Sequence, residues 1–304
     1  MVTESEEFHT IISMGFPEGA AREALHKHSG NLDRALDSLL SPQPYGSNDF
    51  NADESGVNEG SEGTDQKYTE YNGFTIVSTD ISQFTLANGR SACTCIALSG
   101  ARSGLQSLSK KKTSSSPTQE VFTTEFIQNA LFSGIGIYEN KLSVVNDVEH
   151  MSVEEVIRDF PQFSSELHQV EHVRQGILSS PGVNGDNGLQ STLLACRESR
   201  EAKINEWMAV VMTKTPETVT IFLPPPSQAS ETSDQQVRKF VLLDSHPRPN
   251  IFYYNGGSYA MICDSMEDLL KALEKVFPLT DLGEDVSEIM AMMYNSFDMY
   301  AFQL

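Results

Sequence analysis

Cysteine, basic residues and long apolar runs are all scarce in this sequence, and each scarcity excludes a class of protein. Four of the 304 residues are cysteine, and none belongs to a Cys-x-x-Cys pair, so we expect neither a disulfide framework nor structural zinc. No stretch approaches the roughly 18 apolar residues of a membrane-spanning helix, so we expect no membrane partner. Basic side chains number 21 against 42 acidic ones, and the net charge of −21 argues against nucleic acid as a partner, because it repels phosphate backbones.

The first residues also lack the positive charge of a targeting peptide. They read Met-Val-Thr-Glu-Ser-Glu-Glu, whereas signal and transit peptides are basic there. We therefore expect a cytoplasmic or nuclear protein, whose cysteines stay free thiols in a reducing compartment.

Apolar residues at helical spacing open the chain and then stop. They predict short helices over about 4–13, 18–28 and 31–40. Residues 42–67 are acidic, polar and glycine-containing, with almost nothing to bury, and this composition predicts a disordered linker. The first domain is therefore expected to span residues 1–41.

Residues 68–304 predict one larger domain. Helical patterns dominate its first half. Four apolar runs of strand length follow in its second half, at 207–212, 219–223, 240–243 and 259–263. Helices packed on an antiparallel sheet, in this order along the chain, are typical of the α+β class.

Two further segments of this domain have a predicted conformation. Residues 84–86 predict a short strand ahead of a turn at Asn88 and Gly89. Residues 107–118 contain three lysines in a row among Ser and Thr residues, and they predict a flexible insertion.

A Met-Gly-Phe loop separates the first two predicted helices. Met14, Gly15 and Phe16 form this loop, and Leu39 and Leu40 end the third helix. This combination closely resembles the ubiquitin-associated (UBA) family, over residues 4–41. The resemblance implies a three-helix bundle in which these five residues form an apolar patch that binds the hydrophobic surface of ubiquitin. Apolar side chains exposed in such a patch are explained if the patch binds a partner. The alternative is that Phe16 and Leu39 only close a small core.

Two cysteines lie where a polar turn runs into an apolar helix. Cys93 and Cys95 fall in the first turn of a helix expected from about Ser91. Backbone N–H groups and the helix dipole favour a thiolate there and can hold an oxyanion. The alternative is packing, because cysteine also behaves as a small hydrophobic residue. The cysteines alone leave both interpretations open.

An Asp-x-His pair ends the apolar strand predicted at 240–243. Asp244 and His246 are two residues apart, so their side chains project from the same side of an extended chain. Asp244 could then orient the imidazole of His246 toward a thiol; the alternative is a polar strand end that enters a loop. No metal and no cofactor are expected, because the other histidines have no converging spacing: His9, His26, His28, His150, His168 and His172.

Together these segments resemble a papain-like cysteine peptidase, and specifically the viral tegument-like deubiquitinases, over roughly residues 70–280. The resemblance implies that Cys93 is the nucleophile and His246 the general base. It also implies that Asp244 is the orienting acid and that Gln83 donates to the oxyanion.

The sequence departs from that family's pattern near the cysteines. Ala92 precedes Cys93 where viral members tend to have Gln, and Gln83 lies nearer to the cysteine than expected. Cys95 competes for the role of nucleophile, because Thr-Cys-Ile-Ala is similar to the Ser-Cys-Trp-Ala of papain. Cys93 is preferred because it lies closer to the helix start.

A ubiquitin-binding module joined to a cysteine peptidase predicts a deubiquitinase, a thiol protease that hydrolyses the isopeptide bond after the C-terminal glycine of ubiquitin. Its partners would be ubiquitin, polyubiquitin chains and ubiquitinated proteins. Two other functions stay open: a non-catalytic ubiquitin-binding adaptor, and a protease for another ubiquitin-like modifier.

Overall fold

The computed structural model divides the chain into two compact units, residues 1–62 and 63–304. Of the first unit, the structure describes residues 7, 8, 18–28, 30, 31 and 35. Of the second, it describes residues 67–71, 73–111, 114, 116–144, 150–179, 186–226, 239–252, 254, 256–283 and 286–304. Nearly all of the predicted linker at 42–67 lies outside the described residues, and so do Met14, Gly15, Phe16, Leu39 and Leu40.

The first unit contains helix α2 (Glu18–Lys27), where the sequence predicts one. Residues from all three predicted helices are buried: Phe8, Ala24, Leu25 and Ala35. The Arg22 guanidinium lies over the Phe8 ring, 4.7 Å from its centroid. Beyond the helix, Gly30 has a φ of +81° and donates its N–H to the Leu25 carbonyl at 2.7 Å, a helix stop that favours glycine.

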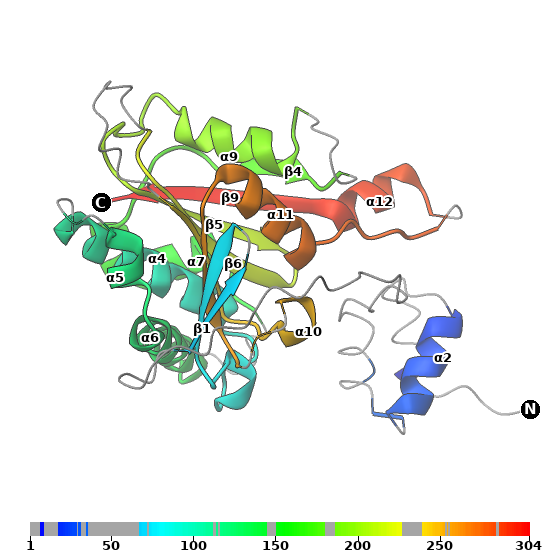
Figure 1. Ribbon diagram of the computed structural model, residues 1–304. Helices are drawn as coiled ribbons and strands as arrows, with labels where there is room; N and C mark the ends of the chain where they lie inside the picture. Colours follow the sequence, from blue (N-terminus) through cyan, green and yellow to red (C-terminus); the bar gives the residue numbers. More distant parts are fainter. Residues whose placement is uncertain are drawn as a thin grey trace, which may run out of the picture. The chain divides into compact units, whose positions relative to one another are not determined.

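In the described part of the second unit, nine strands form one antiparallel sheet (Figure 1). The strand order is β1-β2-β8-β7-β6-β5-β9-β3, and β4 also pairs with β9. The strands are β1 (Lys67–Tyr71), β2 (Phe74–Ser78), β3 (His168–Gln169), β4 (Arg174–Ile177), β5 (Met208–Lys214), β6 (Glu217–Leu223), β7 (Phe240–Asp244), β8 (Tyr259–Cys263) and β9 (Ser296–Gln303). The four apolar runs of the sequence are the strands β5, β6, β7 and β8 in the middle of this sheet.

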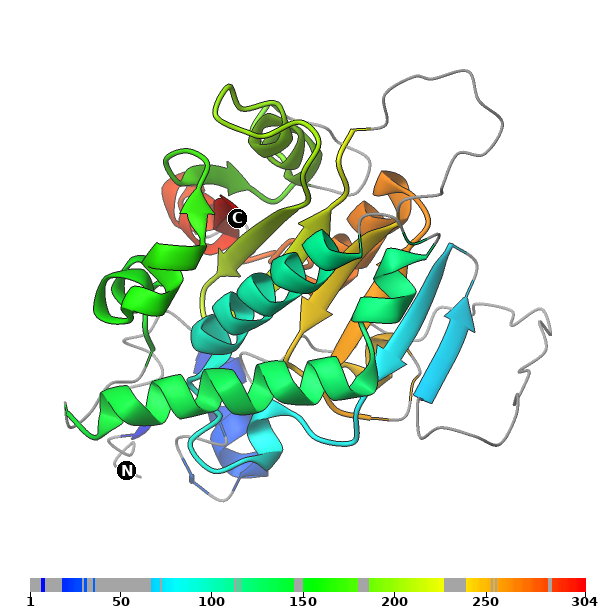
Figure 2. The ribbon, with the colours of Figure 1, turned by 90° about the vertical axis from the view of Figure 1, so that its left-hand side faces the viewer.

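Helices cover both faces of the sheet. Along β5, Val211 packs into the core on one face and Val210 into the core on the other, the alternation expected of a strand with two buried faces. Helices α4 (Cys93–Lys110) and α6 (Thr124–Leu142) pack on the first face and lie in front of the strands in Figure 2. Helix α11 (Met266–Val276) packs on the second face. The α+β class predicted from the sequence agrees with this arrangement.

The other helical segments are short: η1 (Gln83–Thr85), α5 (Pro117–Val121), α7 (Val153–Asp159), α8 (Pro161–Glu166), α9 (Leu189–Arg197), α10 (Pro249–Phe252) and α12 (Glu288–Asn295). The strand predicted at 84–86 is therefore wrong, because η1 is a 3-10 turn. The Thr85 hydroxyl accepts the backbone N–H of Ser82 at 2.9 Å, and the Thr85 N–H donates to the Ser82 carbonyl at 3.1 Å. Local hydrogen bonds of this kind compete with strand pairing.

The flexible insertion predicted at 107–118 has the wrong boundaries. Helix α4 continues to Lys110 because Leu105 and Leu108 are buried in the core. Helix α5 begins at Pro117, a residue that suits a first helical turn. Of the segment between the two helices, residues 112, 113 and 115 lie outside the described residues.

Candidate active site

Cys93 is the first residue of α4 and is only 1% exposed. The turn before the helix fixes this position. A Cβ atom on Gly89 would lie 2.1 Å from the carbonyl oxygen of Gln83, so only glycine fits there. The Gly89 carbonyl then accepts the N–H of Ala92, the N-cap of α4, at 3.0 Å. The polar turn read from the sequence thus places Cys93 at the helix start.

The thiol of Cys93 meets groups from distant segments. Its Sγ lies 3.7 Å from the carbonyl oxygen of Pro216, in the turn between β5 and β6. The side chains of His246 and His150 also interact with the thiol. The structure therefore brings together Cys93 and His246, as the sequence predicts, and adds His150.

Asp244, the last residue of β7, orients the imidazole of His246. Its Oδ1 lies 2.7 Å from Nδ1 of His246 and accepts the backbone N–H of the same residue at 2.9 Å. Both side chains are buried. Because Nδ1 faces Asp244, Nε2 is the ring nitrogen left for the thiol.

A buried arginine holds Asp244 from the other side. Nε of Arg248 donates to Oδ2 of Asp244 at 2.7 Å, and its Nη2 donates to Oε2 of Glu217 at 2.6 Å. The hydroxyl of Tyr259 donates to the same Oδ2 at 3.2 Å. Sequence reasoning missed Arg248, although an arginine four residues after Asp244 in a buried segment is a recognisable signal. Glu217 and Tyr259 come from other strands and gave no such signal.

Burial and charge act in opposite directions on these groups. Burial alone would raise the pKa of Cys93, but His150 and His246 lower it to about 6. Burial would lower the pKa of His246, but Asp244 and the thiol raise it to about 10. Burial would also raise the pKa of Asp244, while Arg248 and His246 hold it well below its usual range. At neutral pH this is a thiolate beside an imidazolium, the ionisation state of a nucleophilic cysteine.

Cys95 lies in different surroundings, two residues away. Its thiol is fully buried, and Sγ lies 4.0 Å from the sulfur of Met151. Burial, and then the charge of Cys93, raise the pKa of Cys95 to about 12. It is therefore a neutral thiol in the core, and of the two cysteines that compete in the sequence, only Cys93 has surroundings that favour a thiolate.

His150 reaches this site although its spacing in the sequence predicts no partner. The next residue, Met151, is buried against Cys95, which holds this segment beside the first turn of α4. Contacts between such remote segments leave no sequence signal. Across the described residues, no group of three or more His, Cys, Asp or Glu side chains is arranged to hold a metal ion.

Gln83 lies beside the site, with its amide engaged on both sides. Nε2 donates to the Arg90 carbonyl at 3.2 Å, and Oε1 accepts from the Ser245 hydroxyl at 2.6 Å. The side chain therefore links the turn before α4 to the segment that carries His246. One N–H of the amide serves this link, and the other is its remaining donor.

The ring of Phe84 covers part of His246. The two ring centroids are 5.7 Å apart, and Phe84 is 53% exposed. An exposed apolar side chain thus lies against the buried imidazole.

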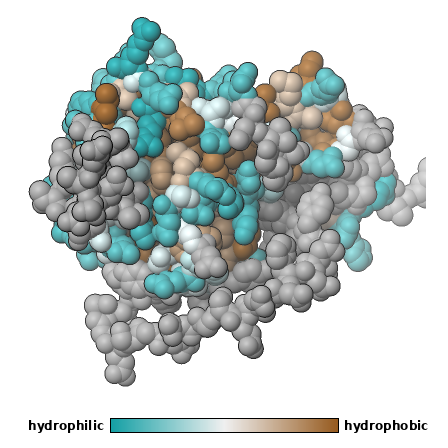
Figure 3. Space-filling model, turned by 45° about the horizontal axis from the view of Figure 1, so that its top comes forward, coloured by the Kyte–Doolittle hydropathy of each residue, from teal (hydrophilic) through white to brown (hydrophobic). Residues whose placement is uncertain are grey.

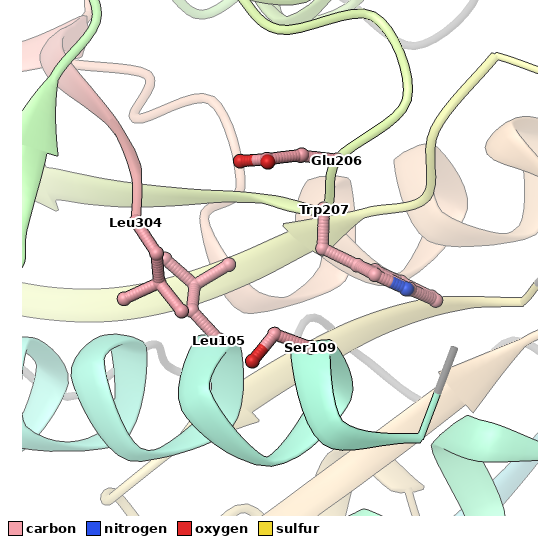
Figure 4. Close-up of a pocket in the computed structure, with 5 residues that line it drawn as sticks. All are labelled: Leu105, Ser109, Glu206, Trp207 and Leu304. Atoms are coloured by element: carbon pink, nitrogen blue, oxygen red, sulfur yellow. The ribbon is translucent and has the colours of Figure 1, made fainter.

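A cavity of about 170 Å³ lies at the opposite end of α4 (Figure 4). It is lined by Leu105, Ser109, Glu206, Trp207 and Leu304. Leu105 is twelve residues after Cys93 along the helix, a separation of roughly 18 Å at about 1.5 Å per residue. The cavity is therefore separate from the thiol and its histidines.

Comparison with known proteins identifies the first unit. The sequence model of the UBA/TS-N domain family matches residues 4–39. The chain carries an N-terminal UBA domain. UBA domains bind ubiquitin and ubiquitinated proteins, so the match supports ubiquitin binding. No curated protein matches the sequence. In the described ranges, no helix combines the length and the apolar character needed to cross a membrane.

Proposed function

We propose that this protein is a cysteine-type deubiquitinase whose UBA domain binds ubiquitin and whose second unit cleaves it from its conjugates. The observation that carries the proposal is the group formed by Cys93, His246 and Asp244. The thiol lies at a helix start, its pKa is lowered to about 6, and it interacts with an imidazole that a buried carboxylate holds at 2.7 Å. The UBA domain indicates that the substrates are ubiquitin conjugates, because UBA domains bind ubiquitin and ubiquitinated proteins.

In the proposed reaction, the Cys93 thiolate attacks the carbonyl carbon of the C-terminal glycine of ubiquitin. His246 gives its proton to the lysine nitrogen as the C–N bond breaks, which leaves a thioester between Cys93 and ubiquitin. Water then attacks the thioester, His246 takes a proton from it, and the thiolate leaves. Asp244 keeps the ring oriented and stabilises the imidazolium.

The negative oxygen of the tetrahedral intermediate needs donors near Sγ. The N–H groups in the first turn of α4 suit this role, because the first N–H groups of a helix have no partner within the helix. We propose that the second N–H of the Gln83 amide assists them. Gln83→Ala should then lower turnover by a factor of about 10–1000, the effect of removing one oxyanion donor.

The UBA domain should bind ubiquitin through Met14, Gly15, Phe16, Leu39 and Leu40, by its resemblance to other UBA domains. Phe16→Ala should then weaken binding of ubiquitin to the full chain, measured by calorimetry. The patch is small, so we expect a dissociation constant on the order of 10–1000 μM.

A non-catalytic adaptor remains the second candidate, and one observation favours it. Cys93 is 1% exposed and His246 is 4% exposed, so a substrate carbonyl reaches the thiol only when neighbours such as Phe84 move. A ubiquitin probe with an electrophile at its C-terminus separates the candidates. We expect an adduct with the full chain and with Cys95→Ala, and none with Cys93→Ala. Reaction only with a probe made from another modifier would change the substrate, and no reaction with any probe would favour the adaptor.

A further inference from the structure

Helix α12 presents an apolar surface to solvent. Ile289, Met290, Met292 and Met293 are 71%, 41%, 52% and 67% exposed. We call these four side chains the α12 surface. Hydrophobic colour gathers at the upper right of Figure 3, the end of the second unit where α12 projects. Exposed apolar side chains that cluster on one short helix mark a surface that binds a partner.

The α12 surface begins at the same end of the strands as Cys93. Helix α12 runs directly into β9, and Asp298 of β9 pairs with Thr213 of β5. This register puts the start of β9 level with the β5–β6 turn, where Pro216 contacts the Cys93 thiol. Figure 1 shows α12 projecting beyond that end of β9. Its eight residues extend about 12 Å at roughly 1.5 Å per residue.

Hydrogen bonds from Asn295 and Ser287 hold α12 in place. Nδ2 of Asn295 donates to the carbonyls of Thr280 and Ala291, each at 3.0 Å, and its Oδ1 accepts the Thr280 N–H at 2.8 Å. The Ser287 hydroxyl accepts the Met290 N–H at 3.3 Å and caps the start of the helix. The apolar side chains therefore stand on a fixed helix, which reduces the entropy lost when a partner binds.

The size and charge of this region indicate what it binds. A stable dimer buries about 800 Å² on each partner, more than one eight-residue helix offers, and a net charge of −21 repels a second copy. A patch this small contributes measurably when its partner is also held at a second point, because the contact is then intramolecular. Residues 277–304 carry five acidic and no basic side chains, so the partner combines an apolar face with basic surroundings.

We propose that the α12 surface docks the folded body of the ubiquitin whose C-terminus enters the Cys93 site. The proposal rests on the proposed function and adds to it a specificity surface. Ubiquitin has the hydrophobic surface that UBA domains bind, and its tethered C-terminus is the second contact that so small a patch needs.

Two substitutions and two probes test this docking in the full chain. Ile289→Glu and Met293→Glu place charge on the surface without touching the site. Ile204→Glu is the matched control, because Ile204 is 67% exposed. It precedes Trp207 and β5, so it lies at the opposite end of the strands. One probe is whole ubiquitin with a C-terminal electrophile; the other is a peptide of ubiquitin's last few residues with the same electrophile.

We expect both α12 variants to react with the ubiquitin probe about tenfold more slowly or worse, the loss of one interface hot spot. Their rates with the peptide probe and with iodoacetamide should equal those of the wild type, as should all rates of the Ile204→Glu control. Unchanged rates with the ubiquitin probe would overturn the docking but leave the deubiquitinase intact. Slower reaction with all three reagents would also overturn it, because the substitution would then act on the site.

A wild type that reacts with iodoacetamide but with neither ubiquitin-derived probe would overturn the proposed function itself. Sedimentation of the wild type tests whether a second copy of the chain covers the α12 surface instead. A dimer that Met293→Glu dissociates would show that a second copy of the chain covers α12, and would overturn the proposal.

Discussion

The two ends of α4 lie in different surroundings. At its head, residues 93–95, the Cys93 thiol is buried beside two histidines, and a chain of ion pairs continues through Asp244 to Arg248. At its tail, residues 105–110, Leu105 and Leu108 are buried in the apolar core, next to a cavity lined by Trp207. Buried charges cost free energy unless each is paired, whereas apolar contacts stabilise the fold. The tail of α4 therefore holds the helix in the core, and the head can carry groups that serve chemistry.

The sharpest test of this contrast removes one group from each end. We expect His246→Ala to lower turnover of isopeptide-linked diubiquitin about as much as Cys93→Ala, because members of one catalytic unit are not additive. Trp207→Phe, at the tail, should keep turnover near that of the wild type. Asp244→Asn should cost less than His246→Ala, because it removes the orientation of the base and not the base. If His246→Ala retained turnover, His246 would not be the general base.

The buried ion pairs at the head predict a large effect on stability. Arg248→Gln removes the buried guanidinium that pairs with both Asp244 and Glu217, so the free energy of unfolding should fall by about 3–5 kcal/mol. The matched control is Arg102→Gln, in the middle of α4, whose partner Glu166 and own side chain are both about a third exposed. That change should cost about 1 kcal/mol or less. Urea unfolding measures both, and equal losses would contradict the contrast between buried and exposed pairs.

The two cysteines at the head should respond differently to pH. Because the pKa of Cys93 is lowered to about 6, its alkylation by iodoacetamide should be nearly constant above that pH and fall about tenfold per pH unit below it. The pKa of Cys95 is raised to about 12, so it should stay unmodified in the native protein at pH 8. His246→Ala should move the Cys93 midpoint upward. Mass spectrometry of both peptides gives the rates, and a Cys93 midpoint near 9 would contradict the interaction with the histidines.

The same ionisations link pH to stability, with opposite signs. The lowered pKa of Cys93 stabilises the native state fully above its ordinary value of 9.0, and this stabilisation is lost as the pH falls through about 6. The raised pKa of His246 stabilises it fully below 6.5, and this is lost as the pH rises through about 10. The summed contribution of the two groups to the free energy of unfolding should therefore be constant between about pH 6.5 and pH 9.0. Urea unfolding across this range checks it, with Cys93→Ser as the variant that removes the plateau.

The smallest effect is expected at Phe84. Its ring covers His246, so Phe84→Ala should expose the site and speed alkylation of Cys93. An aromatic contact worth about 0.5–1.5 kcal/mol corresponds to a factor of about 2–10 in rate. Phe132→Ala is a suitable control, because Phe132 is similarly exposed, at 55%, but lies on α6. An equal increase in both variants would mean that Phe84 does not cover the site.

Much of the sheet can be predicted from the sequence, because its central strands are buried on both faces. Strands β5, β7 and β8 contain continuous apolar runs, so length and composition identify them. Strand β9 was missed although it lies in the same sheet, because Asp298 interrupts its apolar pattern and only the pairing with β5 explains it. The edge strand β1 is short and polar, and its partner β2 decides its conformation.

The residues of the candidate site also differ in whether a local sequence pattern predicts them. Cys93 and His246 follow from local patterns, a helix start and a strand end, and the structure brings them together. His150 and Glu217 reach the site through contacts between remote segments, so no local pattern predicts them. Arg248 is the intermediate case, since its spacing from Asp244 is visible but its burial is not. Gln83 was predicted next to the site, and the structure adds its link between Arg90 and Ser245.

If the Cys93 thiolate attacks the C-terminus of ubiquitin, a covalent intermediate forms between them, and it can be trapped. The full chain is mixed with isopeptide-linked diubiquitin, quenched in acid during the first turnover, and digested for mass spectrometry. We expect a ubiquitin thioester on the peptide that contains Cys93 and Cys95, sensitive to hydroxylamine, present in Cys95→Ala and absent in Cys93→Ala. A thioester that persists in Cys93→Ala, or diubiquitin that is cleaved equally well by that variant, would contradict this mechanism.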